Sequence, residues 1–143
     1  MPSQGDVLIA TTQQKNDVRQ KAIDMDRIEN KKLLIWDKET MLERFQGDEL
    51  LAKEILAGFS EDLPSRLEGL KRGLNAKDMA TAALYAHSVR GAAANMGADI
   101  LQHLAKEMEL ACNNNDVDNL NINIKFLEEA VEDFLKEISM HEN

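Results

Sequence analysis

Apolar residues recur every three or four positions along most of this chain, the spacing of the buried stripe of an amphipathic helix. The longest stripe follows Asp48, and Pro64 falls inside it, where a bend is expected. Its apolar positions are Leu56, Phe59, Leu63, Leu67, Leu70 and Leu74. A last helix carries the same pattern, with Leu120, Ile124, Leu127, Val131, Phe134 and Ile138 on one face. The pattern therefore predicts long helices.

Capping residues predict where the first two helices begin and end. Asp37 is able to cap a short helix that extends through Phe45. Gly47 then ends that helix, and Asp48 provides the cap of the long one.

The next two helices show similar signals. Asn75, with Asp78 three residues later, predicts the cap of a third helix that runs to Met96 and stops at Gly97. Asp99 with Gln102 repeats this signature for a fourth helix, and the polar run 113–118 is expected to be a loop. The inward residues of the fourth helix are Leu101, Leu104, Met108 and Ala111.

Four long amphipathic helices with short connections predict an all-α fold, an antiparallel four-helix bundle with the additional short helix covering one end. The bundle domain is expected to occupy residues 33–143. Residues 1–32 are more polar and carry only a thin apolar stripe, which is typical of a linker or a weakly held N-terminal helix.

Composition limits the possible partners. The chain has 17 Lys and Arg against 26 Asp and Glu, a formal net charge of −9, which argues against binding to nucleic acid or to an anionic membrane. No apolar run approaches the roughly 20 residues of a membrane span. A single cysteine, Cys112, without an export signal indicates a cytoplasmic domain, although the parent chain could be membrane-anchored.

One helical face does not resemble an ordinary solvated surface. In the third helix Val89 lies on the inward stripe, and His87 lies about 200° away around the axis, so it points outward. An exposed histidine is most often a solvated residue without a role. Here, however, the same face is nearly free of long polar side chains, since the other residues on it are Ala83, Leu84, Arg90, Gly91 and Ala94.

Gly91 and Arg90 make this face a candidate site. A glycine inside a helix costs about 1 kcal/mol relative to alanine, so Gly91 is expected to give another molecule access to the imidazole. Arg90 lies beside His87 on the helix surface, and its paired donors suit the oxygens of a phosphoryl group. A solvated charge or an ordinary ion pair is the alternative for Arg90.

The segment 86–98, AHSVRGAAANMGA, resembles the signature of histidine-containing phosphotransfer (HPt) domains of the type found at the C-terminus of hybrid sensor histidine kinases. Arg90 stands where that family most often has lysine. The resemblance implies that His87 accepts a phosphoryl group from a receiver-domain phospho-aspartate and passes it to an aspartate of another receiver domain, in two-component signal transduction.

The resemblance also implies response-regulator receiver domains as partners, docking on the face around His87. The chain itself would bind no cofactor, because the Mg²⁺ would be held by the receiver. The sequence contains no glycine-rich phosphate loop, so a phosphoryl carrier without ATP-dependent kinase activity is expected. Counting along two antiparallel helices places Met108 or Glu109 level with His87, which makes Glu109 a candidate acceptor for the second imidazole nitrogen.

Other interpretations remain open. The chain could be a structural adaptor or dimerisation bundle in which His87 is incidental. A sensor-kinase dimerisation domain normally has an acidic residue after its histidine, whereas this chain has Ser88. A metal site from His87, His103, Cys112 and His141 lacks the usual paired spacing of ligands.

Overall fold

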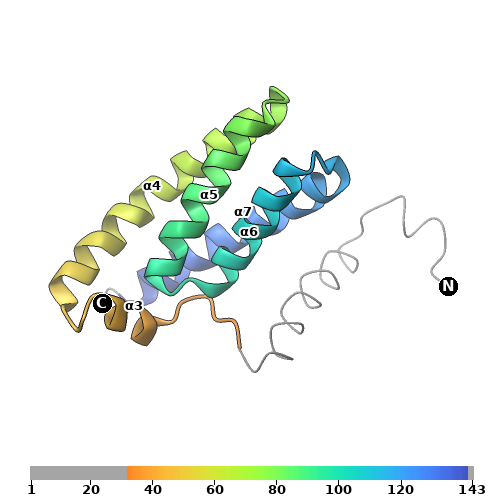
Figure 1. Cartoon of the computed structure of the whole chain (residues 1–143). Helices are drawn as coiled ribbons and strands as arrows, with labels where there is room; N and C mark the ends of the chain where they lie inside the picture. The colour runs from red at the N-terminus through yellow and green to blue at the C-terminus, as the bar shows by residue number, and fades with distance from the viewer. Residues whose placement is uncertain (1–31, 142–143) are drawn as a thin grey trace. The chain divides into compact units, whose positions relative to one another are not determined.

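The computed structural model describes residues 32–141 of the chain (Figure 1). The predicted linker or N-terminal helix falls almost wholly on residues outside this range. The described helices belong to one compact unit that begins at Leu34. They are α3 (Lys38–Arg44), α4 (Glu49–Asn75), α5 (Met79–Met96), α6 (Asp99–Asn113) and α7 (Val117–His141).

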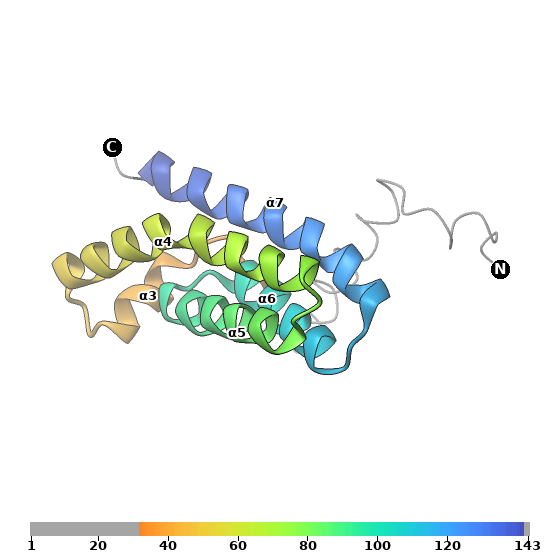
Figure 2. The same cartoon turned by 90° about the horizontal axis from the view of Figure 1, so that it is seen from above.

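The four long helices form an antiparallel bundle. Each packs against the next along the chain, and α7 returns to contact α4. Figure 1 shows the direction alternating from helix to helix, and in Figure 2 α7 and α5 lie on opposite sides of α4. The short α3 packs against α5 and α4 at one end of the bundle. The predicted all-α bundle is therefore confirmed. None of the described helices is both long enough and apolar enough to span a membrane.

The predicted apolar stripes form the core. Most of their members are buried, while Leu67, Leu74 and Ile124 are half-buried at its edge. Phe59 of α4 and Phe134 of α7 meet edge to face with their ring centroids 5.6 Å apart, which joins the two outer helices. The helix α4 continues through the exposed Pro64 without a break.

Three aspartates cap helices as their sequence positions indicate. Asp37, Asp48 and Asp78 each accept a hydrogen bond from the backbone N–H three residues later. At Asp78 the Thr81 hydroxyl also donates to the carboxylate, and this bond together with the backbone one lowers the pKa of Asp78. The predicted pairing with Asn75 is wrong, because Asn75 is the last residue of α4 and Asp78 caps α5 alone.

The prediction that Asp99 caps the fourth helix is also wrong. The cap residue is Ala98, and Asp99 is the buried first residue of α6. Its carboxylate accepts a hydrogen bond from the Leu34 N–H at 3.3 Å, and the Ile100 N–H donates to the Leu34 carbonyl at 3.1 Å. Asp99 therefore fixes the segment before α3 to the start of α6, a long-range contact that local spacing does not reveal.

The connection between the last two helices is shorter than predicted. The polar run 113–118 contributes its first residue to α6 and its last two to α7, so only residues 114–116 separate the helices. Asp116 accepts a hydrogen bond from the Asn119 N–H at 3.2 Å, as the capping aspartates of the other helices do. The last two residues of the predicted loop, 117 and 118, thus form the first turn of α7.

Glycines allow two close approaches that position α5. A Cβ atom on Gly73 would lie 2.9 Å from the backbone nitrogen of Ala82, so α4 and α5 pack backbone to backbone there. Gly97 ends α5 in the left-handed conformation at φ 74°, and its carbonyl accepts a hydrogen bond from the Asp37 N–H at 2.7 Å. A side chain at Gly97 would collide with the Asp37 carbonyl.

We expect Gly97→Ala to lower the free energy of unfolding by at least about 2 kcal/mol, because the methyl group adds a collision to a strained backbone conformation. Urea denaturation followed by circular dichroism measures this change. The matched control is Gly58→Ala on α4, where an added Cβ meets nothing within 4 Å, and that variant should be as stable as the parent or more stable by up to about 1 kcal/mol. Equal stability of both variants would contradict the role assigned to Gly97.

Candidate functional site

His87 lies at the middle of α5 with its side chain directed away from the core. Val89 and Ala86 on the same helix are buried in the bundle, whereas 59% of the His87 side-chain surface is exposed. This is the orientation that the helical spacing predicts. The imidazole is thus held by a rigid helix and remains accessible from outside.

Two side chains contact the imidazole. Glu109 extends from α6, and its Oε2 lies 3.0 Å from Nδ1 of His87. Arg90, one turn along α5, places Nη2 3.3 Å from the same Nδ1 and Nη1 3.3 Å from Oε1 of Glu109. The Glu109 side chain is only 18% exposed. The three residues therefore form a cluster across α5 and α6, as the antiparallel register suggested for Glu109.

The contacts at Nδ1 compete with each other. A carboxylate only accepts hydrogen bonds, so the approach of Glu109 favours a proton on Nδ1, and a protonated Nδ1 has no lone pair for Arg90. The Arg90 contact to Oε1 has the distance of an ion pair but not the geometry of a hydrogen bond, and Oε1 is a buried oxygen without a hydrogen-bond partner. The nearer and oppositely charged partner of the Nδ1–H group is therefore Glu109.

This arrangement leaves Nε2 as the free nitrogen of the ring. Within residues 32–141 no polar atom contacts Nε2 of His87 at hydrogen-bond distance. With the proton on Nδ1, the lone pair of Nε2 faces outward from the exposed side of α5. An exposed neutral imidazole nitrogen with a lone pair is a nucleophile.

The surface around His87 is nearly bare. An added Cβ at Gly91 would meet nothing within 4 Å, so this glycine is not required for helix packing. Leu84 is 70% exposed, and Ala83 and Ala94 are half-buried. The sequence-predicted surface residues therefore share one face, on which Arg90 is the one long polar side chain beside the imidazole.

The sequence does not indicate that a second arginine, Arg66, lies near the site. Arg66 of α4 donates a hydrogen bond from Nη1 to the backbone carbonyl of Ser88 at 3.3 Å, next to His87 in the chain. Its guanidinium also lies 5.8 Å from the centre of the Phe59 ring and 3.9 Å from the Asp62 carboxylate. No local pattern identifies Arg66, because its position depends on how α4 and α5 align.

The four residues considered as metal ligands, His87, His103, Cys112 and His141, do not form a cluster in residues 32–141. No group of three or more His, Cys, Asp or Glu side chains within residues 32–141 is arranged to hold a metal ion. His141 instead pairs with Glu137 at 3.2 Å. Burial, and to a lesser extent the charge of Glu109, raise the pKa of the Cys112 thiol. A buried protonated thiol is a core residue rather than a ready ligand.

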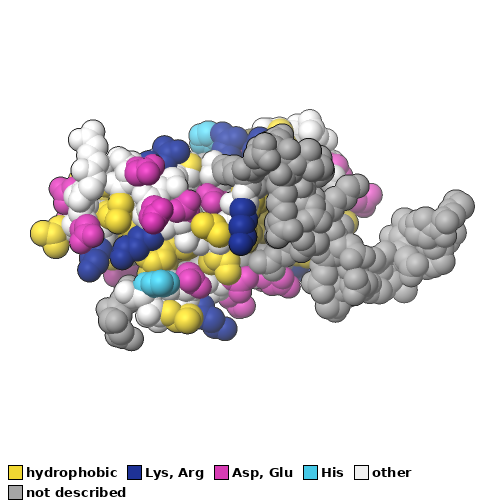
Figure 3. Space-filling model, turned by 90° about the horizontal axis from the view of Figure 1, so that it is seen from below, with side chains coloured by type: hydrophobic (Ala, Val, Ile, Leu, Met, Phe, Trp, Pro, Cys, Tyr) yellow, Lys and Arg dark blue, Asp and Glu magenta, His cyan; other side chains and the backbone are white. Residues whose placement is uncertain are grey.

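On the face seen in Figure 3, acidic and basic side chains alternate, and hydrophobic side chains are exposed between them. Local placement of charge, as in the His87, Arg90 and Glu109 cluster, therefore matters more for chemistry than the net charge of −9.

Comparison with known proteins adds three findings. Residues 54–139 match the family model described as the Hpt domain. The "Phosphorelay intermediate protein rdeA" of Dictyostelium discoideum is 21% identical over 104 residues, which cover 73% of this chain and 41% of that protein. The chain thus spans less than half the length of this relative.

The third finding concerns the fold. The crystal structure of the HPT domain from a sensor hybrid histidine kinase of Shewanella superimposes with a TM-score of 0.67 at 23% identity. The match covers 74% of this chain and 92% of that domain. At this identity the likeness shows a shared fold.

The Nδ1–H tautomer, which is the minor neutral form of a free histidine side chain, should be the major neutral form of His87. Replacing Glu109 by alanine removes the acceptor and lets Arg90 donate to Nδ1, so the proton should move to Nε2. Long-range ¹H–¹⁵N correlation spectra of the ring distinguish the two tautomers directly.

Glu107→Ala is the matched control, since Glu107 is on the same helix and contacts neither His87 nor Arg90. It should leave the tautomer unchanged. A parent protein with the proton mainly on Nε2 would show that Glu109 does not orient the ring.

Proposed function

We propose that this chain, which belongs to the Hpt domain family, carries a phosphoryl group on Nε2 of His87 between the aspartates of two receiver domains. The observation that supports this most strongly is the engagement of Nδ1 by Glu109, which leaves Nε2 as an exposed nucleophile on a bare helical face. The printed name of the Dictyostelium relative, a phosphorelay intermediate, points to the same class of function.

The transfer step needs only one bond to form and one to break. The Nε2 lone pair attacks the phosphorus of an aspartyl phosphate, and the phosphorus–oxygen bond to the aspartate breaks with its electron pair, which restores the carboxylate. The ring keeps its proton on Nδ1 and becomes positively charged. Glu109, at 3.0 Å from Nδ1, then stabilises that charge, and the reverse step returns the phosphoryl group to a second aspartate.

Arg90 is the proposed partner of the phosphoryl oxygens. Its guanidinium lies 3.3 Å from Nδ1 of the imidazole and is 35% exposed, so its long side chain is free to turn toward a group on Nε2. A phosphoryl group adds about −1.5 to −2 charge to an acidic protein, if phosphohistidine behaves like other phosphorylated side chains. A neighbouring cation therefore compensates the added charge where it appears.

Receiver domains are the proposed partners. The docking surface would be the face of α5 that surrounds His87, and its small apolar residues suit a transient interface. The Mg²⁺ and the acidic pocket that the transfer requires would belong to the receiver, and a cytoplasmic location follows from such partners. The surface is made of Ala83, Leu84, His87, Arg90, Gly91 and Ala94.

Incubation with a phosphorylated receiver domain and Mg²⁺ should place on the chain a label that acid removes and base does not, as expected for phosphohistidine. Phosphoramidate, a small phosphoryl donor, should give the same product without a partner. His87→Gln should abolish labelling by both donors and leave the circular dichroism spectrum unchanged, since the residue is exposed.

His103→Gln is the matched control, because His103 lies on α6 outside the cluster and should not affect labelling. A native chain without acid-labile label from either donor would overturn the phosphocarrier proposal and favour a purely structural bundle. Labelling that survives His87→Gln would place the site on another residue.

Gly91 provides a separate test of access. Gly91→Gln should slow transfer from a receiver domain by about tenfold or more, because a long side chain one turn from His87 obstructs a docked protein. Labelling by phosphoramidate should change much less, since the small donor avoids the obstruction. Gly91→Ala is the control of minimal size, and both variants should fold at least as stably as the parent. Equal slowing with both donors would contradict a role in docking.

A further inference from the structure

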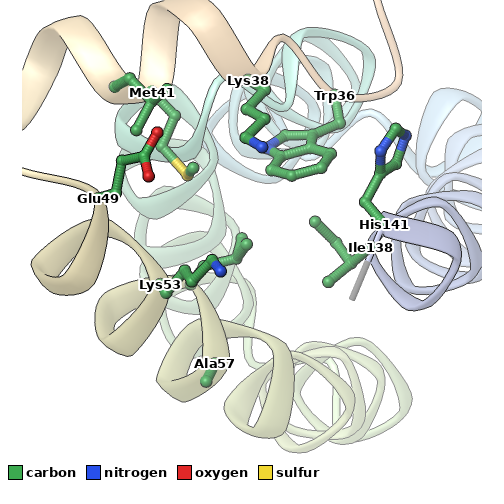
Figure 4. Close-up of a pocket in the computed structure, with 10 residues that line it drawn as sticks. Trp36, Lys38, Met41, Glu49, Lys53, Ala57, Ile138 and His141 are labelled. Atoms are coloured by element: carbon green, nitrogen blue, oxygen red, sulfur yellow. The ribbon is translucent and has the colours of Figure 1, made fainter. Parts of the chain in front are cut away.

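A cavity of about 340 Å³ lies on another part of the bundle (Figure 4). It is bounded by the segment before α3, by α3 itself, by the first half of α4 and by the end of α7. Its lining includes no residue of α5 or α6, the helices that carry His87 and Glu109. Any ligand of this cavity would therefore occupy a place distinct from the proposed phosphotransfer site.

The cavity walls are mainly apolar. Met41, Leu56 and Ile138 contribute side chains from α3, α4 and α7. In Figure 4, the small side chain of Ala57 leaves space on the α4 side. The volume is at the lower end of the range of about 300 to 1,000 Å³ that is usual for small-molecule pockets. A bare inorganic anion would leave these walls without contacts, whereas a ligand with an apolar body of several carbon atoms would cover them.

Two lysines bring positive charge to the cavity. Lys38 comes from the first residue of α3 and Lys53 from the second turn of α4, and both line the space. Neither lysine lies within 4.0 Å of a carboxylate in the described part of the chain. Glu49 is the one acidic residue of the lining. The cavity thus has a positive balance in a chain whose net charge is −9.

Trp36 forms one side of the cavity. Its Nε1 atom is covered and has no hydrogen-bond partner in the described part of the chain. The ring is held edge-on to His141 with centroids 5.3 Å apart. In Figure 4, Trp36 and Lys38 are on the same side of the cavity. The indole ring therefore offers apolar surface, rather than a free donor, to a ligand of the cavity.

We propose that this cavity binds a small monocarboxylate with an apolar body, of the size of a medium-chain fatty acid. The carboxylate is held by Lys38 and Lys53, while the hydrocarbon part lies against Met41, Leu56 and Ile138. Charge complementarity selects the acid over neutral molecules, and the volume of the cavity limits the length of its hydrocarbon part.

Trp36 is the single tryptophan of the chain, so its fluorescence reports on the cavity directly. Titration of the full chain with octanoate should give a saturable fluorescence change with a dissociation constant below about 1 mM. Octanamide has the same hydrocarbon chain without the charge, and it should bind at least about tenfold more weakly.

Three variants locate the binding. The double substitution Lys38→Gln and Lys53→Gln should weaken octanoate binding by about tenfold, the expected loss of two exposed charge contacts. Ala57→Leu should weaken binding by filling the space while keeping both lysines. Lys125→Gln is the matched control, because Lys125 is an exposed lysine of α7 that does not line the cavity, and it should bind as the parent does.

Several outcomes would overturn the proposal. The absence of a saturable response to octanoate, or equal affinities for octanoate and octanamide, would each do so. An unchanged affinity in both the double lysine variant and Ala57→Leu would show that the acid binds elsewhere. Circular dichroism of each variant confirms that a loss of binding does not come from a loss of fold.

Discussion

The contact between Glu109 and Nδ1 of His87 is the interaction on which the candidate chemistry depends. It joins two helices, fixes the orientation of the ring and determines which nitrogen keeps its lone pair. The exposed histidine without this contact would be an ordinary surface residue. The Glu109 side chain is only 18% exposed, so water competes less for its carboxylate than it would at an open surface.

The tight connection between α5 and α6 makes this contact possible. Gly97 in the left-handed conformation and Ala98 are the two residues between the helices, so residues at equal distances from the turn face each other. The Asp37 N–H donates to the Gly97 carbonyl, and the Leu34 N–H donates to the Asp99 carboxylate. The segment before α3 therefore makes hydrogen bonds on both sides of the turn between α5 and α6. The chain segment around α3 therefore supports the register of the site without contacting it.

The sequence predicted the helices well because the buried stripe and most caps of each helix depend on residue spacing within that helix. The stripes, the caps at Asp37 and Asp48 and the outward direction of His87 all follow from spacing within one helix. The cap assigned to Asp99 failed because this aspartate is recruited by a distant backbone amide. Arg66 was missed for the same reason, as its contact with α5 depends on the alignment of two helices.

Arginine rather than lysine next to His87 has a geometric consequence. The guanidinium of Arg90 directs Nη1 toward Glu109 and Nη2 toward the imidazole, so one side chain spans both partners. A lysine carries a single ammonium group at one point, so it would contact either the Glu109 carboxylate or a group on the ring. In the proposed carrier, the planar fork would let Arg90 stay close to Glu109 while it also approaches a phosphoryl oxygen. Arg90 would then offset part of the negative charge that the proposed phosphoryl group adds.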